Sequence, residues 1–147
     1  RALRTAEYLY IRNYAPERWP AGAPDYDAPA HGAYGDVDTS PTKAWMIEHA
    51  EDPEVAPLFE LCFGKRPAEE LYHVPSDPDQ MQNVADDPAH AEALKTLRAR
   101  LDKHLESHGD PRTRGESPWD ANPFYYMKIL NYKDQITNPH ILESLSR

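Results

Sequence analysis

A strand, a proline-broken turn and a capped helix follow one another within residues 70–108, and this order constrains the fold more than any other feature of the chain. Leu71 and Val74 suit a short, half-buried strand because branched and aromatic residues favour a pleated surface. Pro75 and Pro78 have no N–H to donate to a neighbouring strand, so the strand has to end there. The prolines therefore separate the strand from the helix that follows.

The helix is predicted over residues 88–108. Asp87 offers a carboxylate to cap its free N–H groups, Pro88 suits its first position, and Gly109 supplies the stop. Its apolar residues recur at helical spacing and form one stripe, made of Ala91, Leu94, Leu97, Leu101 and Leu105. We expect Leu94, Leu97 and Leu101 to pack on a sheet formed by residues 5–13 and 70–74.

Residues 3–14 predict one long strand of an antiparallel sheet, since they are rich in aromatic and branched side chains. Alternation places Leu9 and Ile11 on one face and Tyr8, Tyr10, Arg12 and Tyr14 on the other. Residues 15–38 have no period and predict a long loop, and loops of that length are commonly functional.

Two short helices are predicted next. Ser40 caps the first and Pro41 opens it, with Trp45 and Met46 on its apolar face. The second runs over residues 54–62, and the side chains expected on its apolar side are Val55, Leu58, Phe59 and Cys62. We expect Cys62 to be a small buried hydrophobe. Residues 110–118 predict an extended linker, followed by an aromatic cluster that includes Trp119, Phe124, Tyr125 and Tyr126.

These elements predict an α+β fold: a small antiparallel β-sheet with one long C-terminal helix packed on it, short helices, and an extended aromatic tail. The predicted domain covers residues 1–109. The tail, residues 110–147, is expected to pack on the same or a neighbouring domain.

Charge and composition exclude some classes of partner. A net charge of −9 over 147 residues argues against nucleic acid and against anionic membrane surfaces. No apolar run approaches the length that a membrane span needs. One cysteine excludes an internal disulfide.

Two blocks resemble the C-terminal part of sulfatases. The segment from Glu70 to Pro88 is similar to the family pattern E-L-Y-D-L, a D-P turn, then N-L-A and D-P before a long helix. The N-terminal block resembles the strand R-x-x-R-T-x-x-Y-x-Y-I-R-N through Arg1, Arg4, Thr5, Tyr8, Tyr10, Ile11, Arg12 and Asn13. The piece from Asp38 to Thr42 and the run from Lys65 to Tyr72 resemble the branch that contains N-sulfoglucosamine sulfohydrolases. His73 departs from the pattern, which has Asp there, and we expect a surface or turn substitution.

The resemblance implies a parent enzyme that hydrolyses sulfate esters or sulfamates, with a formylglycine made from a C/S-x-P-S-R motif and a divalent cation, calcium. This chain lacks that motif, and Cys62 stands in Leu-Cys-Phe-Gly-Lys. We therefore expect no catalytic residue, no metal site and no cofactor here, and a chain that is inactive alone. The implied compartment is periplasmic, secreted or lysosomal.

The loop before Ser40 is the best candidate for contact with substrate. Asp36, Asp38, Thr39 and Ser40 are polar side chains before a helix N-terminus, which can bind an anionic or sugar group. The alternative is helix capping with interdomain packing.

Two other clusters have structural interpretations. Asp86-Asp87 fits a helix N-terminus better than a metal pair, because carboxylates there meet the helix dipole. His104 and His108 have a spacing that metal sites use, but no third ligand is evident, so a solvated helix face is favoured.

The resemblance implies three partners: the N-terminal catalytic domain of the same polypeptide, a sulfated sugar through that parent, and possible self-association over an uncovered face. The residues expected on that face are Trp19, Tyr26 and Tyr34 of the long loop and the aromatics of the tail. One alternative function is a stand-alone protein- or carbohydrate-binding module, whose acidic face and exposed aromatics would recruit the partner. Another alternative is a purely structural piece that remains after proteolysis.

Overall fold

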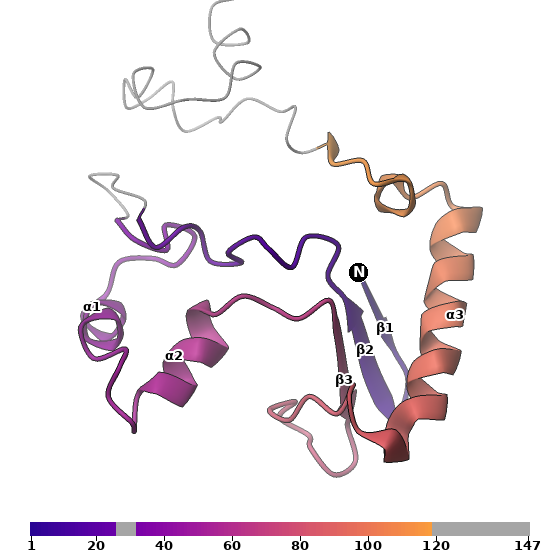
Figure 1. Ribbon diagram of the computed structural model, residues 1–147, viewed down its shortest axis with the longest axis horizontal. Helices are drawn as coiled ribbons and strands as arrows, with labels where there is room; N and C mark the ends of the chain where they lie inside the picture. Colours follow the sequence, from indigo (N-terminus) through magenta and orange to yellow (C-terminus); the bar gives the residue numbers. More distant parts are fainter. Residues whose placement is uncertain (26–31, 119–147) are drawn as a thin grey trace, which may run out of the picture. The chain divides into compact units, whose positions relative to one another are not determined.

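The computed structural model describes residues 1–25 and 32–118. The chain divides into two compact units, residues 1–101 and 102–147, and the long helix α3 crosses from the first into the second. Residues 119–147 of the predicted tail, which include its aromatic cluster, and Tyr26 lie outside the described residues. The α+β prediction is confirmed: the described part combines an antiparallel sheet with one long helix and short helices (Figure 1).

The sheet has three strands, β1 (Ala2–Arg4), β2 (Tyr8–Arg12) and β3 (Glu69–His73), in the spatial order β1-β2-β3. Both pairs are antiparallel, and Tyr10 at the centre lies opposite Leu3 on one side and Leu71 on the other. Tyr10 and Leu71 have no exposed surface, so this pair forms the middle of the sheet's buried face.

The prediction of one long strand over residues 3–14 is wrong, because the chain turns back after Arg4. The Thr5 N–H donates to the Tyr8 carbonyl at 2.8 Å, and the Thr5 hydroxyl oxygen accepts from the Tyr8 N–H at 2.9 Å. The two residues between them carry no Gly, Asn or Asp, which are the ordinary signals of a tight hairpin. A threonine side chain therefore stabilises a turn that composition does not reveal.

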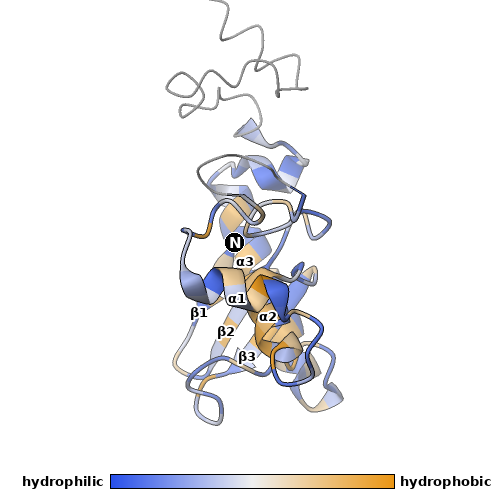
Figure 2. Cartoon of the chain, turned by 90° about the vertical axis from the view of Figure 1, so that its left-hand side faces the viewer, coloured by the Kyte–Doolittle hydropathy of each residue, from blue (hydrophilic) through white to orange (hydrophobic). Residues whose placement is uncertain are grey.

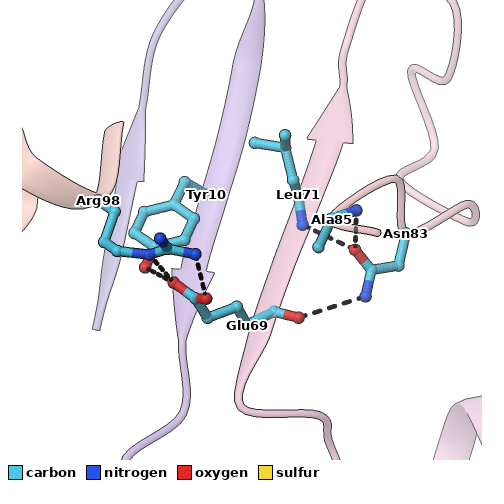
Figure 3. A network of polar contacts seen from close by, with 6 residues as sticks. All are labelled: Tyr10, Glu69, Leu71, Asn83, Ala85 and Arg98. Carbon is cyan, nitrogen blue, oxygen red and sulfur yellow. Dashed lines mark hydrogen bonds and ion pairs between the residues drawn. The ribbon is translucent and has the colours of Figure 1, made fainter. Parts of the chain in front are cut away.

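Alternation along β2 is as predicted. Tyr10 lies on the buried face, whereas Leu9 and Ile11 point to the opposite face and are half-buried. Helix α3 packs on the same face of the sheet as Tyr10. Its Arg98 side chain contacts Glu69 on β3, which shares that face with Leu71, the residue paired with Tyr10 (Figure 3).

The long helix begins as predicted. A 3₁₀ turn, η1 (Pro88–His90), leads into α3 (Ala91–Ser107). An Asp87 carboxylate oxygen accepts from the Ala89 N–H at 2.8 Å, so this residue caps the start. Leu97 and Leu101 are buried within the first unit, as the apolar stripe predicts, and Leu94 is half-buried.

The end of α3 lies in the second unit and is also as predicted. Gly109 has a φ of +65°, the left-handed conformation that a helix stop favours. The Asp110 N–H donates to the Leu105 carbonyl at 3.0 Å, and the Gly109 N–H to Glu106 at 3.1 Å. Beyond it, the prediction of an extended linker over residues 110–118 is wrong in part, because η2 (Pro111–Arg114) is a 3₁₀ helix capped by the Asp110 side chain.

The outer edge of β3 is covered by the segment around Asn83 (Figure 3). The Asn83 side-chain oxygen accepts from the N–H groups of Leu71 at 2.8 Å and Ala85 at 3.0 Å. The Val84 N–H donates to the Leu71 carbonyl at 2.8 Å. An uncovered strand edge is a template for unwanted pairing, and this asparagine removes it.

Helices α1 (Pro41–Glu48) and α2 (Ala56–Phe63) contribute to a second cluster of buried side chains. Its centre is Ala21, Tyr34 and Phe63, with partly buried Ala33, Val37, Met46, Ile47 and Phe59 packed against it. Because both helices serve this small cluster, each buries only part of its apolar surface.

Several predicted core positions of these helices are exposed. Trp45 and Leu58 are 51% and 54% exposed, and Cys62 is exposed rather than a buried hydrophobe. Figure 2 shows that α2 is hydrophobic along most of its length. No helix in the described residues is long and apolar enough to span a membrane.

Candidate functional site

The candidate loop is anchored at Tyr34. The Tyr34 N–H donates to the Ala23 carbonyl at 3.0 Å, and the Asp36 N–H donates to the Ala21 carbonyl at 3.2 Å, so two loop segments run paired. The Tyr34 ring lies 4.7 Å from the Phe63 ring, measured between centroids. This burial corrects the prediction that Tyr34 belongs to an uncovered face.

The anchoring imposes a cost on the backbone. Tyr34 has a φ of +54°, a conformation that residues with a Cβ atom rarely adopt. Such a conformation costs about 1–3 kcal/mol and persists only where the surroundings enforce it. The backbone at Gly22 packs closely against the backbone at Gly35, the residue after Tyr34, and this packing enforces the conformation. Gly22 has a φ of +87°, and a Cβ atom added to it would lie 2.9 Å from the Gly35 nitrogen.

A buried lysine holds the turn that follows. Lys43 from α1 is only 6% exposed, and its ammonium donates to the carbonyls of Tyr34 at 2.9 Å and Val37 at 2.8 Å. The Val37 N–H also donates to the Tyr34 carbonyl, at 3.1 Å. One cation therefore fixes the turn that carries Asp36 to the N-terminus of α1.

Two of the four predicted site residues meet at a pocket, and two do not. The pocket has a volume of about 490 Å³, and the residues that line it are Gly32, Ala33, Thr39, Ser40, Pro41, Lys43, Ala44 and Ile47. Asp36 and Asp38 are exposed on the turn and are not part of that lining. Ser40 also caps α1, since its hydroxyl oxygen accepts from the Lys43 N–H at 3.0 Å.

The pocket is suited to a ligand with apolar faces and a few hydroxyl groups. Its walls are mainly aliphatic, and the Thr39 and Ser40 hydroxyls at the helix start can donate or accept. Its volume lies within the range of about 300–1,000 Å³ that is ordinary for small-molecule sites. Lys43 lines the pocket while its ammonium is engaged with the turn.

We expect Lys43→Met to lower the free energy of unfolding by about 1–2 kcal/mol, because two carbonyls lose a charged hydrogen-bond donor. Chemical denaturation of the chain measures this loss. Lys95→Met is the matched control, since its ammonium lies 3.9 Å from Glu92 with both side chains exposed. Equal midpoints for the two variants would show that Lys43 does not hold the turn.

Tyr10, Glu69 and Arg98 form a polar network on the sheet that the sequence did not predict (Figure 3). The Arg98 guanidinium donates to both Glu69 carboxylate oxygens, at 2.7 and 2.6 Å, and the Tyr10 hydroxyl donates to one of them at 2.5 Å. The hydrogen bond from Arg98 is the main reason that the pKa of Glu69 is lowered. Burial, followed by the hydrogen bond to Glu69, raises the pKa of Tyr10 to about 12.

A second carboxylate lies on the opposite face. Glu70 is 8% exposed, accepts from the Tyr72 hydroxyl at 2.5 Å and accepts from the Asn13 amide at 2.7 Å. Burial, followed by the hydrogen bond to Glu70, raises the pKa of Tyr72 to about 12. Each network includes partners that are far apart in sequence, Arg98 with Glu69 and Asn13 with Glu70, so spacing gave no sign of these contacts.

The two clusters to which the sequence assigned structural roles, Asp86-Asp87 and His104 with His108, lie at the start and the end of the long helical segment. Asp87 caps η1, and His104 and His108 are exposed at the end of α3 with ring centroids 4.2 Å apart. Among residues 1–25 and 32–118, no group of three or more His, Cys, Asp or Glu residues is arranged to hold a metal ion.

Comparison with known proteins finds a similarity to a sulfatase. Over 121 residues, 80% of this chain, the sequence is 31% identical to an ulvan-active sulfatase from Formosa agariphila. The chain covers 18% of the length of that protein. No protein-family model matches the chain, and no solved structure matches it. The chain is thus related to one segment of a sulfatase.

Proposed function

We propose that this chain is the C-terminal part of a sulfatase, in which it supports the substrate cleft of a catalytic domain carried by the same polypeptide. The 31% identity to a sulfatase over 80% of the chain carries this proposal. The segment from Glu70 to Pro88 adds support, because its family-like residues have definite tasks: Asn83 covers the edge of β3 and Asp87 caps the helix start.

The catalytic centre belongs to the rest of the parent enzyme in this proposal. Among the described residues, no group of three or more His, Cys, Asp or Glu side chains is arranged to hold a divalent cation, and the sequence has no site for formylglycine. The residues of this chain therefore bind and position, and they perform no step on the sulfate group. The proposed substrate class is a sulfated sugar that carries a sulfate ester or a sulfamate, and the relative's name describes that protein as a sulfatase active on ulvan.

The pocket at the start of α1 is the proposed point of contact with substrate. Thr39 and Ser40 line an open, mainly aliphatic pocket, and their hydroxyls suit the hydroxyls of a sugar ring whose C–H faces meet the apolar walls. In this proposal the exposed carboxylates of Asp36 and Asp38, on the preceding turn, accept hydrogen bonds from sugar hydroxyls outside the pocket.

The catalytic domain is also the proposed cover for the outer side of α2. Leu58 and Leu61 are 54% and 41% exposed, and Cys62 is exposed beside them. Apolar side chains gathered on one helix face commonly mark a contact surface. Self-association of the isolated chain over this face is the expected consequence of removing that cover.

The proposal is tested with the full reading frame that contains this chain, by measuring sulfate release from ulvan, from an aryl sulfate and from N-sulfoglucosamine, with calcium present. We expect release by the full protein and none by the 147-residue chain alone. Thr39→Ala is expected to raise KM about 2–10-fold, the value of one hydrogen bond. Thr96→Ala, an exposed threonine on α3, is the matched control.

Three outcomes would contradict parts of this proposal. A full protein that releases no sulfate from any substrate would overturn the sulfatase assignment. Turnover by the purified chain that survives Cys62→Ala would show that the chain holds a catalytic centre. Sugar binding by the chain without turnover in the full protein would favour the alternative, a stand-alone carbohydrate-binding module.

A further inference from the structure

Two histidines that are distant in sequence lie together at one end of the sheet. His73 is the last residue of β3 and His90 the last residue of η1, and their ring centroids are 5.6 Å apart. The ring of Tyr8, which pairs with His73 across the strands, lies 5.1 Å from His73 and 5.8 Å from His90. All three side chains are half-buried, which restricts the motion of the rings.

Each imidazole is oriented by a hydroxyl group through its Nδ1 atom. The His73 Nδ1 lies 2.7 Å from the Ser76 hydroxyl, and the His90 Nδ1 lies 3.0 Å from the Tyr8 hydroxyl. Within residues 1–25 and 32–118, neither Nε2 atom has a hydrogen-bond partner. A hydroxyl oxygen can accept from Nδ1–H, and that tautomer leaves the lone pair on Nε2.

We propose that His73 and His90 form a binding site for a divalent transition-metal ion, with Zn²⁺ as the representative. Imidazole nitrogen is a preferred ligand of Zn²⁺, Cu²⁺ and Ni²⁺. A tetrahedral zinc with Zn–N distances of about 2.0–2.1 Å places two ligating rings with their centroids roughly 5 Å apart. The observed separation of 5.6 Å is close to that spacing, so both rings lie within reach of one ion once their Nε2 atoms turn toward it.

The surroundings supply the outer contacts that such sites use. A ligating histidine ordinarily donates its other N–H to an acceptor that fixes the ring, and the hydroxyls of Tyr8 and Ser76, within hydrogen-bond distance of Nδ1, can serve as those acceptors. Because the described residues offer no third ligand of the His, Cys, Asp or Glu type here, water fills the remaining positions. We therefore expect micromolar affinity, and a site independent of the cation proposed for the catalytic domain.

Isothermal titration of the metal-stripped 147-residue chain with zinc chloride at neutral pH tests the site. We expect one saturable site that is lost in His73→Gln and in His90→Gln. Tyr8→Phe, which removes only the hydroxyl contact, is expected to weaken binding about tenfold or more. His104→Gln is the matched control, because His104 and His108 form another close imidazole pair among the described residues and are exposed.

A second measurement uses the unmodified chain, so its result does not depend on whether the variants fold. In ¹H–¹⁵N spectra of the imidazole groups, zinc should shift the Nε2 signals of His73 and His90 before those of other histidines. Absence of saturable binding would overturn the proposal. So would binding that survives loss of both His73 and His90, or that disappears with His104→Gln.

Discussion

Leu97→Ala is expected to lower the free energy of unfolding by about 2–5 kcal/mol, because truncating a buried leucine removes apolar contacts and leaves a cavity. Leu97 is 6% exposed, in the part of α3 that also carries Arg98, the partner of Glu69 on the sheet. A small domain has a total stability of roughly 5–15 kcal/mol, so this one change consumes a large share of it. Urea denaturation followed by circular dichroism measures the loss.

Leu61→Ala is the matched control for this prediction. Leu61 is 41% exposed on α2, against 6% for Leu97, so the same truncation removes less buried surface from the monomeric chain. Equal midpoints for the two variants would show that the apolar stripe of α3 does not contribute to the core of the first unit.

Glu69→Ala is expected to cost about 2–3 kcal/mol, the second largest effect. The change removes the acceptor of three hydrogen bonds, two from Arg98 and one from the buried Tyr10 hydroxyl. The Glu69 and Arg98 side chains are 25% and 41% exposed, and solvent screening keeps the loss below that of a fully buried ion pair. Thermal unfolding at neutral pH measures it.

The pH dependence gives the same network a sharper test. The pKa of Glu69 is lowered in the folded chain, so its contribution is complete above the unfolded value of about 4.3 and is lost as the pH falls through the folded value. We therefore expect the thermal midpoint of the native chain to fall below pH 5 more steeply than that of Glu69→Ala. Parallel curves would contradict the ion pair.

Glu116→Ala is the matched control for both measurements. Glu116 accepts from Arg114 through two hydrogen bonds, at 2.8 and 3.1 Å, but both side chains are more than half exposed. Surface ion pairs of this kind contribute little, so we expect an almost unchanged midpoint.

The proposed function gives the two halves of the first unit different tasks. The sheet and α3 form a scaffold in which Tyr10, Glu69 and Arg98 are mutually satisfied. The loop and α1 present a pocket whose shape depends on Lys43 and on the constrained Tyr34. Variants of the scaffold are therefore expected to change stability, and Thr39→Ala to change substrate affinity.

The sequence by itself determined the features that depend on neighbouring residues. Asp87 and Ser40 cap helices, and Gly109 ends α3, because a cap satisfies N–H or carbonyl groups only a few positions away. The leucine stripe of α3 was also predictable from the sequence, since helical periodicity brings those residues to one face. The same locality made the α+β class predictable.

Only the tertiary structure decided which surfaces are buried and which distant residues meet. Trp45, Leu58 and Cys62 have the character of core residues, yet they are exposed because the second cluster is too small to cover both sides of α1 and α2. Packing also decided which of the four candidate site residues line the pocket. At the start of α1 it placed Thr39 and Ser40 in the pocket lining and left Asp36 and Asp38 outside it.

The clearest example is the pair His73 and His90. His73 stands out only as a departure from the family pattern, and nothing in the sequence links it to His90. Their 5.6 Å separation arises from the pairing of β2 with β3 and from the entry of η1 beside Tyr8. Strand register and helix docking are set by burial summed over the whole unit. A juxtaposition of that kind is therefore a property of the folded chain and has no signature in the spacing of its residues.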